Sequence, residues 1–394
     1  MNKVKLRGIT WGHTRGLVPL VATGQRFTEL HPDVEVQWDK RSLQAFADQS
    51  IQALSKEYDL LVIDHPSIGE AQVKGLFLPL DQYLDSAFLE NQAQNSVGAS
   101  HASYQYAGHQ WALAIDAATP VSAARLDVLQ QAGHKVPQSW EALIELAKAG
   151  FVAFAGLKLD CLMHFYTLCV AKGQEPFCES QRLVDKDVAA AALSALQELT
   201  NACGPACLQR NPIAVYELMT TSDQFGYSPF AYGYSNYARA SYVDKPLVFG
   251  GLIQRHGRRL TSTLGGCGLA ISAQSKHQDL AIQYAEYVAS ERIQTGLFTE
   301  MGGQPGHRAA WLETGNNQRS NNYFINTLQT LDEAYVRPRY NGYIHFQEQA
   351  PELVQRFLLG QEGLRKTIED LEALDKTWRQ GRVNEQLHLS EVVS

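Results

Sequence analysis

Trp11, His13 and Arg15 alternate along a short polar stretch that follows the first apolar run of the chain. The indole of Trp11 offers a large rigid face, which suits the apolar side of a sugar ring. His13 and Arg15 supply hydrogen-bond donors, and a guanidinium can hold a carboxylate through two parallel hydrogen bonds. We therefore expect these three side chains to bind a small polar ligand. For each of them, packing, surface exposure or a role at a helix start is the structural alternative.

Two further pairs of candidates follow apolar runs. Thr14 and Gly16 come just before an expected helix, whose unpaired N–H groups favour an anionic or strongly accepting ligand atom. Asp64 and His65 end the apolar run 58–64. An ionised carboxylate only accepts hydrogen bonds, so Asp64 matches the hydroxyl groups of a sugar or polyol. Its alternative role is to cap the turn that follows.

The remaining candidates are spread over the rest of the chain, and each has a structural alternative. The tyrosines among them stand in the aromatic, glycine-containing stretch 225–240, which suits a cleft wall but is also compatible with interior packing. The aspartate can brace a connection between lobes, the glycines can serve a turn, and the arginine can contact ligand or close a cleft. The expected ligand-binding positions of this group are Asp116, Tyr232, Tyr234, Gly265, Gly266 and Arg308, with His164 as a weaker candidate that fits a core position better.

Composition limits the class of protein. With 394 residues the chain exceeds the usual size of one hydrophobic core, so we expect two packed units. The net charge of −7 argues against a general nucleic-acid binder, and we interpret the basic cluster 255–259 as a solvated turn. No run approaches the roughly 20 apolar residues that span a bilayer. The N-terminus has no apolar secretion signal, so we expect either a removed signal or a cytoplasmic protein.

Nothing in the sequence calls for a cofactor or a metal. The six cysteines contain no CxxC pair, and phosphate-loop, nucleophile-elbow and zinc-protease motifs are absent. Cys203 and Cys207 can form a short disulfide in an oxidising compartment, or else be small buried side chains. We therefore expect a binding protein without cofactor or metal, and not an enzyme.

The first part of the chain alternates strands and helices. Strands are predicted at 4–10, 34–38 and 58–64, and helices at 17–30 and 43–55. The run 58–64 is apolar almost throughout, which is typical of a strand buried on both faces of a parallel sheet. This order predicts a parallel α/β lobe, and such sheets bind ligands beyond the carboxyl ends of their strands. The residues after Thr10 and after Ile63 lie at those ends.

The rest of the chain is predicted to leave this lobe and return to it. Helices are expected at 121–132, at 140–149 with Ser139 as N-cap, at 187–202 and over most of the last seventy residues, with a buried strand at 264–271. The stretch 225–240 is expected to be a loop. Crossings near 116 and 262 divide the chain into lobe 1 (1–115 plus 262–315) and lobe 2 (116–261 plus 316–394).

Six segments in the correct order resemble bacterial extracellular solute-binding protein family 1, the sugar-binding proteins that serve ABC importers. The segments are 27–36, 58–64, 111–116, 137–143, 264–272 and 302–308. The resemblance implies an α/β, two-lobed type II binding fold with a hinge and an interlobe cleft. It further implies a periplasmic or extracellular monomer that closes on a sugar, a polyol or a related compound. Such a protein delivers its ligand to the membrane subunits of an ABC importer.

The sequence departs from this family at its start. Members usually carry a secretion signal, and they often show a hydroxyl or small group where this chain has Trp11, His13 and Arg15. A small carboxylate or hydroxy acid is therefore an alternative ligand, and a cytosolic metabolite-binding module is an alternative role. A carbohydrate-active enzyme that uses Asp64 with Asp116 is a further alternative, although nothing in the sequence sets the separation of these carboxylates.

Overall fold

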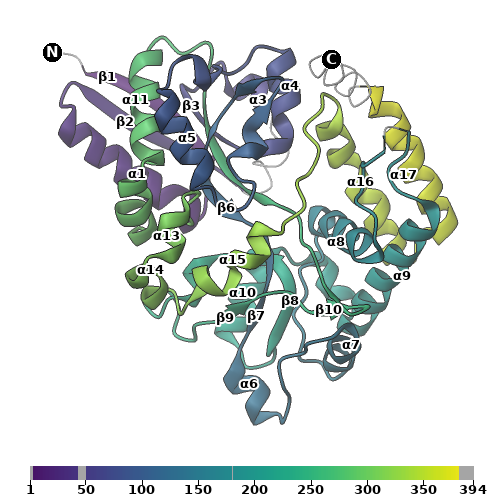
Figure 1. Ribbon diagram of the computed structural model, residues 1–394. Helices are drawn as coiled ribbons and strands as arrows, with labels where there is room; N and C mark the ends of the chain where they lie inside the picture. The colour runs from purple at the N-terminus through teal and green to yellow at the C-terminus, as the bar shows by residue number, and fades with distance from the viewer. Residues whose placement is uncertain (1–2, 43–49, 180, 381–394) are drawn as a thin grey trace. The chain divides into compact units, whose positions relative to one another are not determined.

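The computed structural model describes residues 3–42, 50–179 and 181–380 (Figure 1). Contacts between Cα atoms divide the chain into two compact units. Unit 1 comprises Met1–Ala118, Gly265–Gln318 and Arg339–Asn341, and unit 2 comprises Thr119–Leu264, Arg319–Pro338 and Gly342–Ser394. Each expected boundary falls three residues before the observed one, and the return of 339–341 to unit 1 is absent from the expected division. Gly69 permits this return, because a Cβ there would lie 1.9 Å from the carbonyl oxygen of Arg339.

Unit 1 is built on a five-stranded mixed sheet with the order β2-β1-β3-β12-β6. Its strands are β1 (Val4–Trp11), β2 (Val34–Arg41), β3 (Leu60–Ile63), β6 (Leu113–Ala118) and β12 (Gly265–Ile271). β1 runs parallel to β2 and β3, as predicted, whereas β12 runs antiparallel to β3 and β6. The predicted parallel order covers only the strands of the first 64 residues, and the sequence patterns indicate no direction for the strand at 264–271. The consequence of the antiparallel direction is that β12 begins at the same edge where β1, β2, β3 and β6 end.

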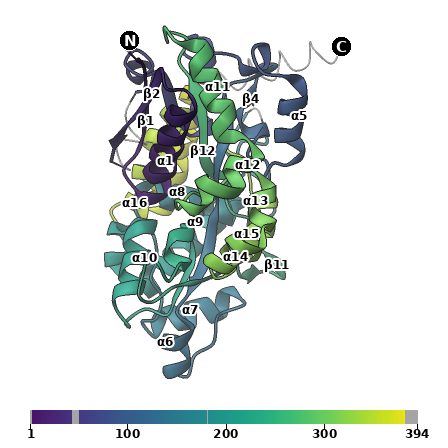
Figure 2. The same cartoon turned by 90° about the vertical axis from the view of Figure 1, so that its left-hand side faces the viewer.

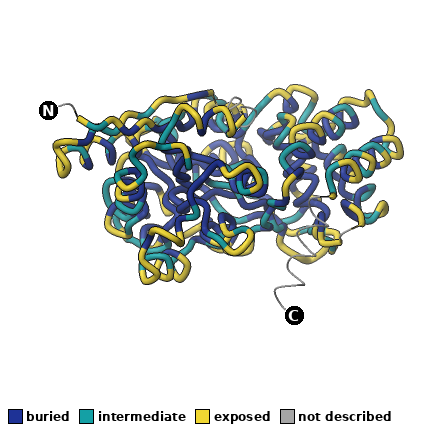
Figure 3. The backbone as a smooth tube through the Cα atoms, turned by 90° about the horizontal axis from the view of Figure 1, so that it is seen from above, coloured by how far each residue is buried: buried dark blue, intermediate teal, exposed yellow. Residues whose placement is uncertain are grey.

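Helices cover both faces of this sheet, which confirms the α/β class. α1 (Thr14–Leu30) and α11 (Gln278–Ala289) lie side by side on one face (Figure 2), and α3 (Ile51–Leu54) and α4 (Ile68–Val73) belong to the other. In β3, Leu60 and Val62 join the core under α1, while Leu61 and Ile63 join the core under α4. The strand is thus buried on both faces, as predicted, and Figure 3 shows buried backbone running inside exposed loops. The helix expected at 43–55 is seen as α3, and 43–49 lie outside the described residues.

Unit 2 contains a three-stranded antiparallel sheet with the order β8-β7-β9. The strands are β7 (Pro120–Ala124), β8 (Tyr227–Tyr232) and β9 (Val248–Gly250). The predicted helix 121–132 is wrong in its first part, because β7 pairs with strands on both sides and only α6 (Leu126–Gln131) is helical. The predicted loop 225–240 is also wrong, since it holds β8 and the 3-10 helix η5 (Ser235–Ala238). Local sequence patterns do not indicate the strands with which β7 and β8 pair, because those strands are distant in the sequence.

Helices make up most of unit 2. Ser139 caps α7 as predicted, because its Oγ accepts a hydrogen bond of 3.3 Å from the N–H of Ala142. The basic cluster 255–259 lies in a hairpin of β10 (Gln254–Arg255) and β11 (Arg258–Arg259), which is exposed except at Arg255, whose guanidinium lies over the Trp140 ring. The helices of this unit include α7 (Trp140–Lys148), α8 (Lys158–Lys172), α9 (Lys186–Cys203), η4 (Pro205–Gln209), α10 (Pro212–Thr221), α15 (Tyr323–Asp332), α16 (Tyr343–Leu358) and α17 (Leu364–Trp378).

Shorter elements complete unit 1 around the sheet. They are η1 (His65–Ser67), η2 (Leu80–Gln82), α5 (Ser86–Gln94), η3 (Ala102–Tyr104), β4 (Gln105–Tyr106), β5 (His109–Gln110), α12 (Glu291–Ile293), the π-helix η6 (Gln294–Phe298), α13 (Arg308–Leu312) and α14 (Thr314–Arg319), whose last residue belongs to unit 2. Within the described residues, no helix has the length and apolar character needed to cross a membrane. All six cysteines are free thiols.

Candidate functional site

Polar and aromatic side chains from five strands meet at one edge of the unit 1 sheet. Trp11 ends β1 and lies in register with Arg41, which ends β2. Asp64 follows β3, and Asp116 lies near the end of β6 opposite Cys267 at the start of β12. Burial is the main cause that raises the pKa of the Cys267 thiol, and the charges of Asp116, Asp64 and Arg41 also act on it. These groups therefore converge, as expected for the carboxyl edge of such a sheet.

The 11–16 segment carries His13 as the N-cap of α1. The His13 Nδ1 atom accepts a hydrogen bond of 3.0 Å from the N–H of Arg15. Burial, and then the positive charge of Arg15, lower the pKa of His13 to about 4. The imidazole is therefore neutral at pH 7, and because Nδ1 accepts, the proton lies on Nε2. Nε2 is therefore the hydrogen-bond donor of this ring.

Trp11 is held in place by its own segment. Its side chain is 4% exposed. A Cβ on Gly16 would lie 2.4 Å from the indole Cδ2 and Cε2 atoms, so Gly16 lets α1 approach the ring closely. The guanidinium carbon of Arg15 lies 5.8 Å from the ring centroid. Part of the indole surface is therefore used for packing against α1, and Thr14, the first residue of that helix, lies in the same turn.

Arg15 forms a two-pronged ion pair with Asp116. Its Nε donates to Oδ1 at 2.8 Å and its Nη2 donates to Oδ2 at 2.5 Å. The two side chains are 4% and 2% exposed. Burial raises the pKa of Asp116, while the charge and the hydrogen bonds of Arg15 act in the opposite direction. The fork predicted to hold a ligand carboxylate is thus engaged with a carboxylate of the protein, and the ligand-binding roles of both residues stay predictions.

Asp64 and His65 form the turn after β3. The Asp64 Oδ1 atom accepts a hydrogen bond of 2.9 Å from the N–H of His65 and lies 3.2 Å from His65 Nδ1. The backbone oxygen of Asp64 accepts from Ser67 Oγ at 2.7 Å. The structural alternative for Asp64, capping of the turn, is therefore present. One carboxylate oxygen can cap while the other faces a ligand, so its predicted role stays open to test.

The glycines and Arg308 occupy different parts of unit 1. Gly266 has a φ of +94°, and a Cβ there would lie 2.3 Å from the carbonyl oxygen of Asp116. The close approach of β6 therefore requires a glycine at this position, and Gly265 pairs with Ala118 beside it. Arg308 begins α13, and its Nε donates to the carbonyl oxygen of Ser96 at 3.1 Å. Arg308 thus lies beside the segment after α5.

The candidates of unit 2 lie in or next to its sheet. The Tyr232 hydroxyl hydrogen-bonds Thr263 Oγ1 at 3.0 Å. Tyr234 is 5% exposed, and its ring centroid lies 6.4 Å from that of Tyr216. His164 is 1% exposed, and its Nε2 hydrogen-bonds the carbonyl oxygen of Ala155 at 2.8 Å. His164 therefore has a core position, which was its structural alternative. Tyr234 also packs in the interior, and its ligand-binding role stays a prediction.

Two arginines near the predicted residues were not anticipated from the sequence. Arg41 is 9% exposed, and burial lowers its pKa to about 10. The sequence predicts a strand that ends at Trp38, whereas β2 continues for three more residues to Arg41. Arg239 follows η5 and is 7% exposed, and burial together with the charge of Arg319 lowers its pKa to about 10. The only feature of the sequence that points to Arg239 is its position directly after the tyrosine-rich stretch.

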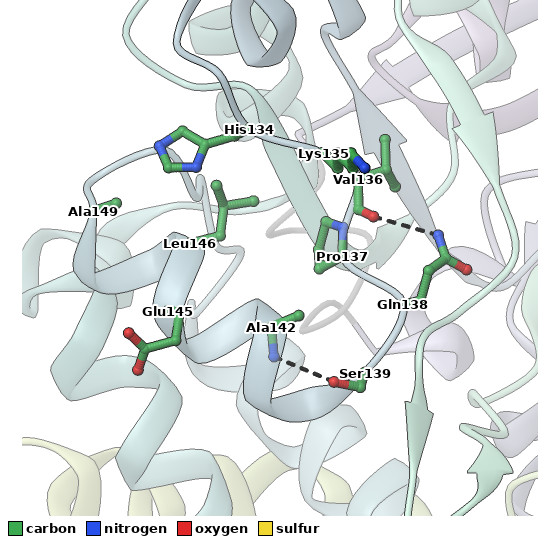
Figure 4. Close-up of a pocket in the computed structure, with 10 residues that line it drawn as sticks. All are labelled: His134, Lys135, Val136, Pro137, Gln138, Ser139, Ala142, Glu145, Leu146 and Ala149. Carbon is green, nitrogen blue, oxygen red and sulfur yellow. Dashed lines mark hydrogen bonds between the residues drawn. The ribbon is translucent and has the colours of Figure 1, made fainter.

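Unit 2 has a surface cavity of about 640 Å³, formed by the 134–139 segment and one side of α7. Figure 4 shows the residues that line it, among them His134 and Glu145, and the capping hydrogen bond between Ser139 and Ala142. None of the predicted ligand-binding residues lines it. Among the described residues, no group of three or more histidine, cysteine or acidic side chains is arranged to hold a metal ion.

Comparison with known proteins gives a family match and structural likenesses. The model of the family described as bacterial extracellular solute-binding protein matches residues 22–310. Maltose-bound MalE3 of T. maritima superposes with a TM-score of 0.82 at 18% identity, covering 93% of this chain and 98% of that one. A solute-binding protein of an Agrobacterium radiobacter ABC transporter, in complex with ribitol, gives 0.78 at 17% identity and covers 94% and 97%.

A third structure agrees with these two. The Thermotoga lettingae solute-binding protein bound to α-D-tagatose gives a TM-score of 0.80 at 16% identity, covering 95% of this chain and 99% of that one. Likeness at this level of identity concerns the fold. The fold is that of the two-lobed periplasmic binding proteins, as predicted.

Proposed function

Since the chain belongs to the family of bacterial extracellular solute-binding proteins, we propose that it binds a sugar, a polyol or a related hydroxylated compound and delivers it to an ABC importer. The family match over residues 22–310 carries this proposal. Structural neighbours that hold maltose, ribitol and α-D-tagatose support the ligand class. The partners would be the small-molecule ligand and the membrane subunits of the importer.

The chemistry at the edge of the unit 1 sheet supports a hydroxylated ligand. Neutral His13 offers a donor at Nε2, Asp64 offers an acceptor, and Trp11 adds an aromatic ring. Hydroxyl groups both donate and accept, so they match such a mixture of groups. We propose that the ligand bridges both lobes, which gives the closed state contacts that an open state lacks and shifts the population toward closure.

We propose that the protein binds its ligand without chemical change. Hydrolysis of a glycosidic bond needs two carboxyl groups that flank the bond, one as acid and one as base or nucleophile. Asp116, the expected partner of Asp64 in such a pair, is 2% exposed and is paired with Arg15. This pairing argues against the enzymatic alternative, and recovery of unchanged ligand after long incubation is the matching test.

A small carboxylate or hydroxy acid is the second candidate ligand. Arg41 lies beside Trp11, and Arg239 lies close enough to Arg319 for the two charges to repel. An anionic ligand group would relieve that repulsion. Binding of such an acid would weaken as salt is added, since screening reduces attraction between charges, whereas binding of a neutral polyol would not.

We further propose that the protein works outside the cytoplasmic membrane, which the family description supports, and that it is a monomer. A cytosolic metabolite-binding module is the alternative. The upstream reading frame discriminates between them, because an encoded apolar signal segment there means export.

A thermal-shift screen tests the function. The panel contains maltose, ribitol, D-mannitol, D-tagatose, gluconate and glucuronate. A ligand that binds only the folded state stabilises it by about 2.7 kcal/mol at one hundred times its Kd, so we expect a clear rise in Tm for at least one sugar or polyol. Shifts for the two acids alone would favour the second candidate. No shift for any member would contradict both.

A matched pair of variants then tests the site. His13→Asn keeps a side-chain oxygen that can cap α1 but removes Nε2, so we expect about tenfold weaker binding of the best panel ligand, or about 1.4 kcal/mol. His307→Asn is the control, because His307 caps α13 in the same way, accepting from Ala309 N–H at 3.3 Å. Equal affinity of both variants and the wild type, by calorimetry, would remove His13 from the site.

A further inference from the structure

The ion pair between Arg15 and Asp116 joins two parts of unit 1 that are 101 positions apart in the sequence. Both hydrogen bonds of the fork are short, at 2.8 and 2.5 Å, and both side chains are nearly inaccessible to solvent. Planar guanidinium and carboxylate groups joined in this way fix each other in orientation as well as in distance. The pair therefore sets the position of whatever is attached to either end.

The Arg15 end carries the residues that we expect to meet the ligand. The backbone N–H of Arg15 donates to His13 Nδ1, so the position of Arg15 sets the orientation of the imidazole. Trp11 lies against Gly16 and within 5.8 Å of the Arg15 guanidinium. The backbone N–H of His13 also donates to the carbonyl oxygen of Trp11 at 3.0 Å. Movement of Arg15 would therefore displace both side chains.

The Asp116 end is anchored in the sheet. Asp116 lies on β6 opposite Cys267 on β12, and the backbone of Cys267 hydrogen-bonds the carboxylate. The preceding residue of β12, Gly266, packs so closely on the carbonyl of Asp116 that a Cβ has no room. The carboxylate is therefore a rigid point to which the mobile end of an arginine can be tied.

We propose that Arg15 and Asp116 are positioning residues, whose ion pair holds the 11–16 segment so that Trp11 and His13 are placed for the ligand before it arrives. The inference rests on the proposed function, because it presumes a ligand at Trp11 and His13. Preorganised groups bind more tightly because less ordering remains to be done on binding. Replacement of a buried ion pair by apolar groups is often neutral or stabilising, so stability alone does not account for charges at this place.

A double-mutant cycle separates positioning from stability. The variants are Arg15→Met, Asp116→Leu and the two combined, measured by urea unfolding and by calorimetry with maltose, ribitol, D-mannitol and D-tagatose. Each single variant leaves one buried charge without its partner, so we expect lower stability. The double variant has neither charge, so we expect stability near that of the wild type together with at least tenfold weaker binding.

Two outcomes would overturn the inference. Wild-type affinity in the stable double variant would mean that the pair does not position the segment. Loss of affinity in Arg15→Met with full affinity in Asp116→Asn would mean that Arg15 contacts the ligand itself. The exposed pair Arg26 and Glu29, on the same helix at 2.7 Å, is the control, and its double variant Arg26→Met with Glu29→Leu should bind normally.

A readout without ligand keeps the inference separate from the proposed function. Fluorine NMR of protein labelled with 5-fluorotryptophan reports on Trp11, whose signal is assigned by Trp11→Phe. We expect this signal to shift or broaden in the double variant and to stay unchanged in the control. An unchanged Trp11 signal would contradict positioning, even if no member of the panel binds the wild type. If Arg15→Met and Asp116→Leu do not fold, the Trp11 signal can still be measured in the double variant and in Arg15→Lys.

Discussion

Burial of neutral histidines is the feature of single residues with the clearest consequence for stability. His101 and His164 are 5% and 1% exposed, and burial lowers the pKa of each to about 4. In the unfolded chain a histidine titrates near 6.5. Between these two values the unfolded state binds more protons than the folded state, so stability falls as pH decreases through this window.

We expect the free energy of unfolding to be lower at pH 5 than at pH 7, by up to about 2 kcal/mol for each of these histidines. Urea unfolding at both pH values measures the difference. His164→Gln should reduce the pH dependence, because it removes one of the groups. His256→Asn, at an exposed hairpin position, should leave it unchanged. The same pH dependence in His164→Gln as in the wild type would contradict this account.

At the scale of elements, the position of α1 against the end of β1 decides how the candidate site is built. The helix begins at Thr14, directly after the turn that carries Trp11 and His13. Gly16 lies in its first turn and touches the indole, and Thr10 Oγ1 donates to the carbonyl oxygen of Gly16 at 3.1 Å. A larger residue at position 16 would force the ring and the helix apart.

Gly16→Ala is therefore expected to reduce stability by about 1–3 kcal/mol, the usual range for overpacking, and to weaken ligand binding as Trp11 moves. Thermal unfolding and calorimetry with the best panel ligand measure the two effects. Gly363→Ala, where a Cβ would meet nothing within 4 Å, is the matched control. Wild-type stability and affinity in Gly16→Ala would show that the indole moves without consequence.

At the scale of the whole molecule, the fold is that of two-lobed binding proteins, and the proposed function requires ligand-dependent closure. Small-angle scattering tests both the ligand-dependent closure and the proposed monomeric state. A compact chain of 394 residues has a radius of gyration of about 21 Å. We expect a mass near 43.8 kDa and a radius that falls when the best panel ligand is added and stays constant with a panel member that does not bind.

Two outcomes of the scattering experiment would contradict separate parts of this expectation. An unchanged radius of gyration at saturating ligand would contradict closure, while the proposal of ligand binding would stand. A mass near twice the expected value would exclude the monomer and leave the binding proposal intact.

The sequence by itself determined the features that local patterns record. The apolar run 58–64 predicted a strand buried on both faces, which β3 is, and Ser139 was recognised as the cap of α7. The order of strands and helices in the first sixty residues and six family-like segments led to the correct fold class. These signals are local because hydrophobic periodicity and capping depend on near neighbours in the chain.

The tertiary structure alone decided what depends on partners distant in the sequence. The antiparallel direction of β12, the strand β7 in place of a helix, and the pairing of Arg15 with Asp116 each join segments that are far apart in the chain. No local pattern specifies which strand a segment pairs with or which acid meets a given arginine. Two of the residues expected to bind ligand therefore proved to be paired with each other, since only the folded chain brings them within hydrogen-bonding distance.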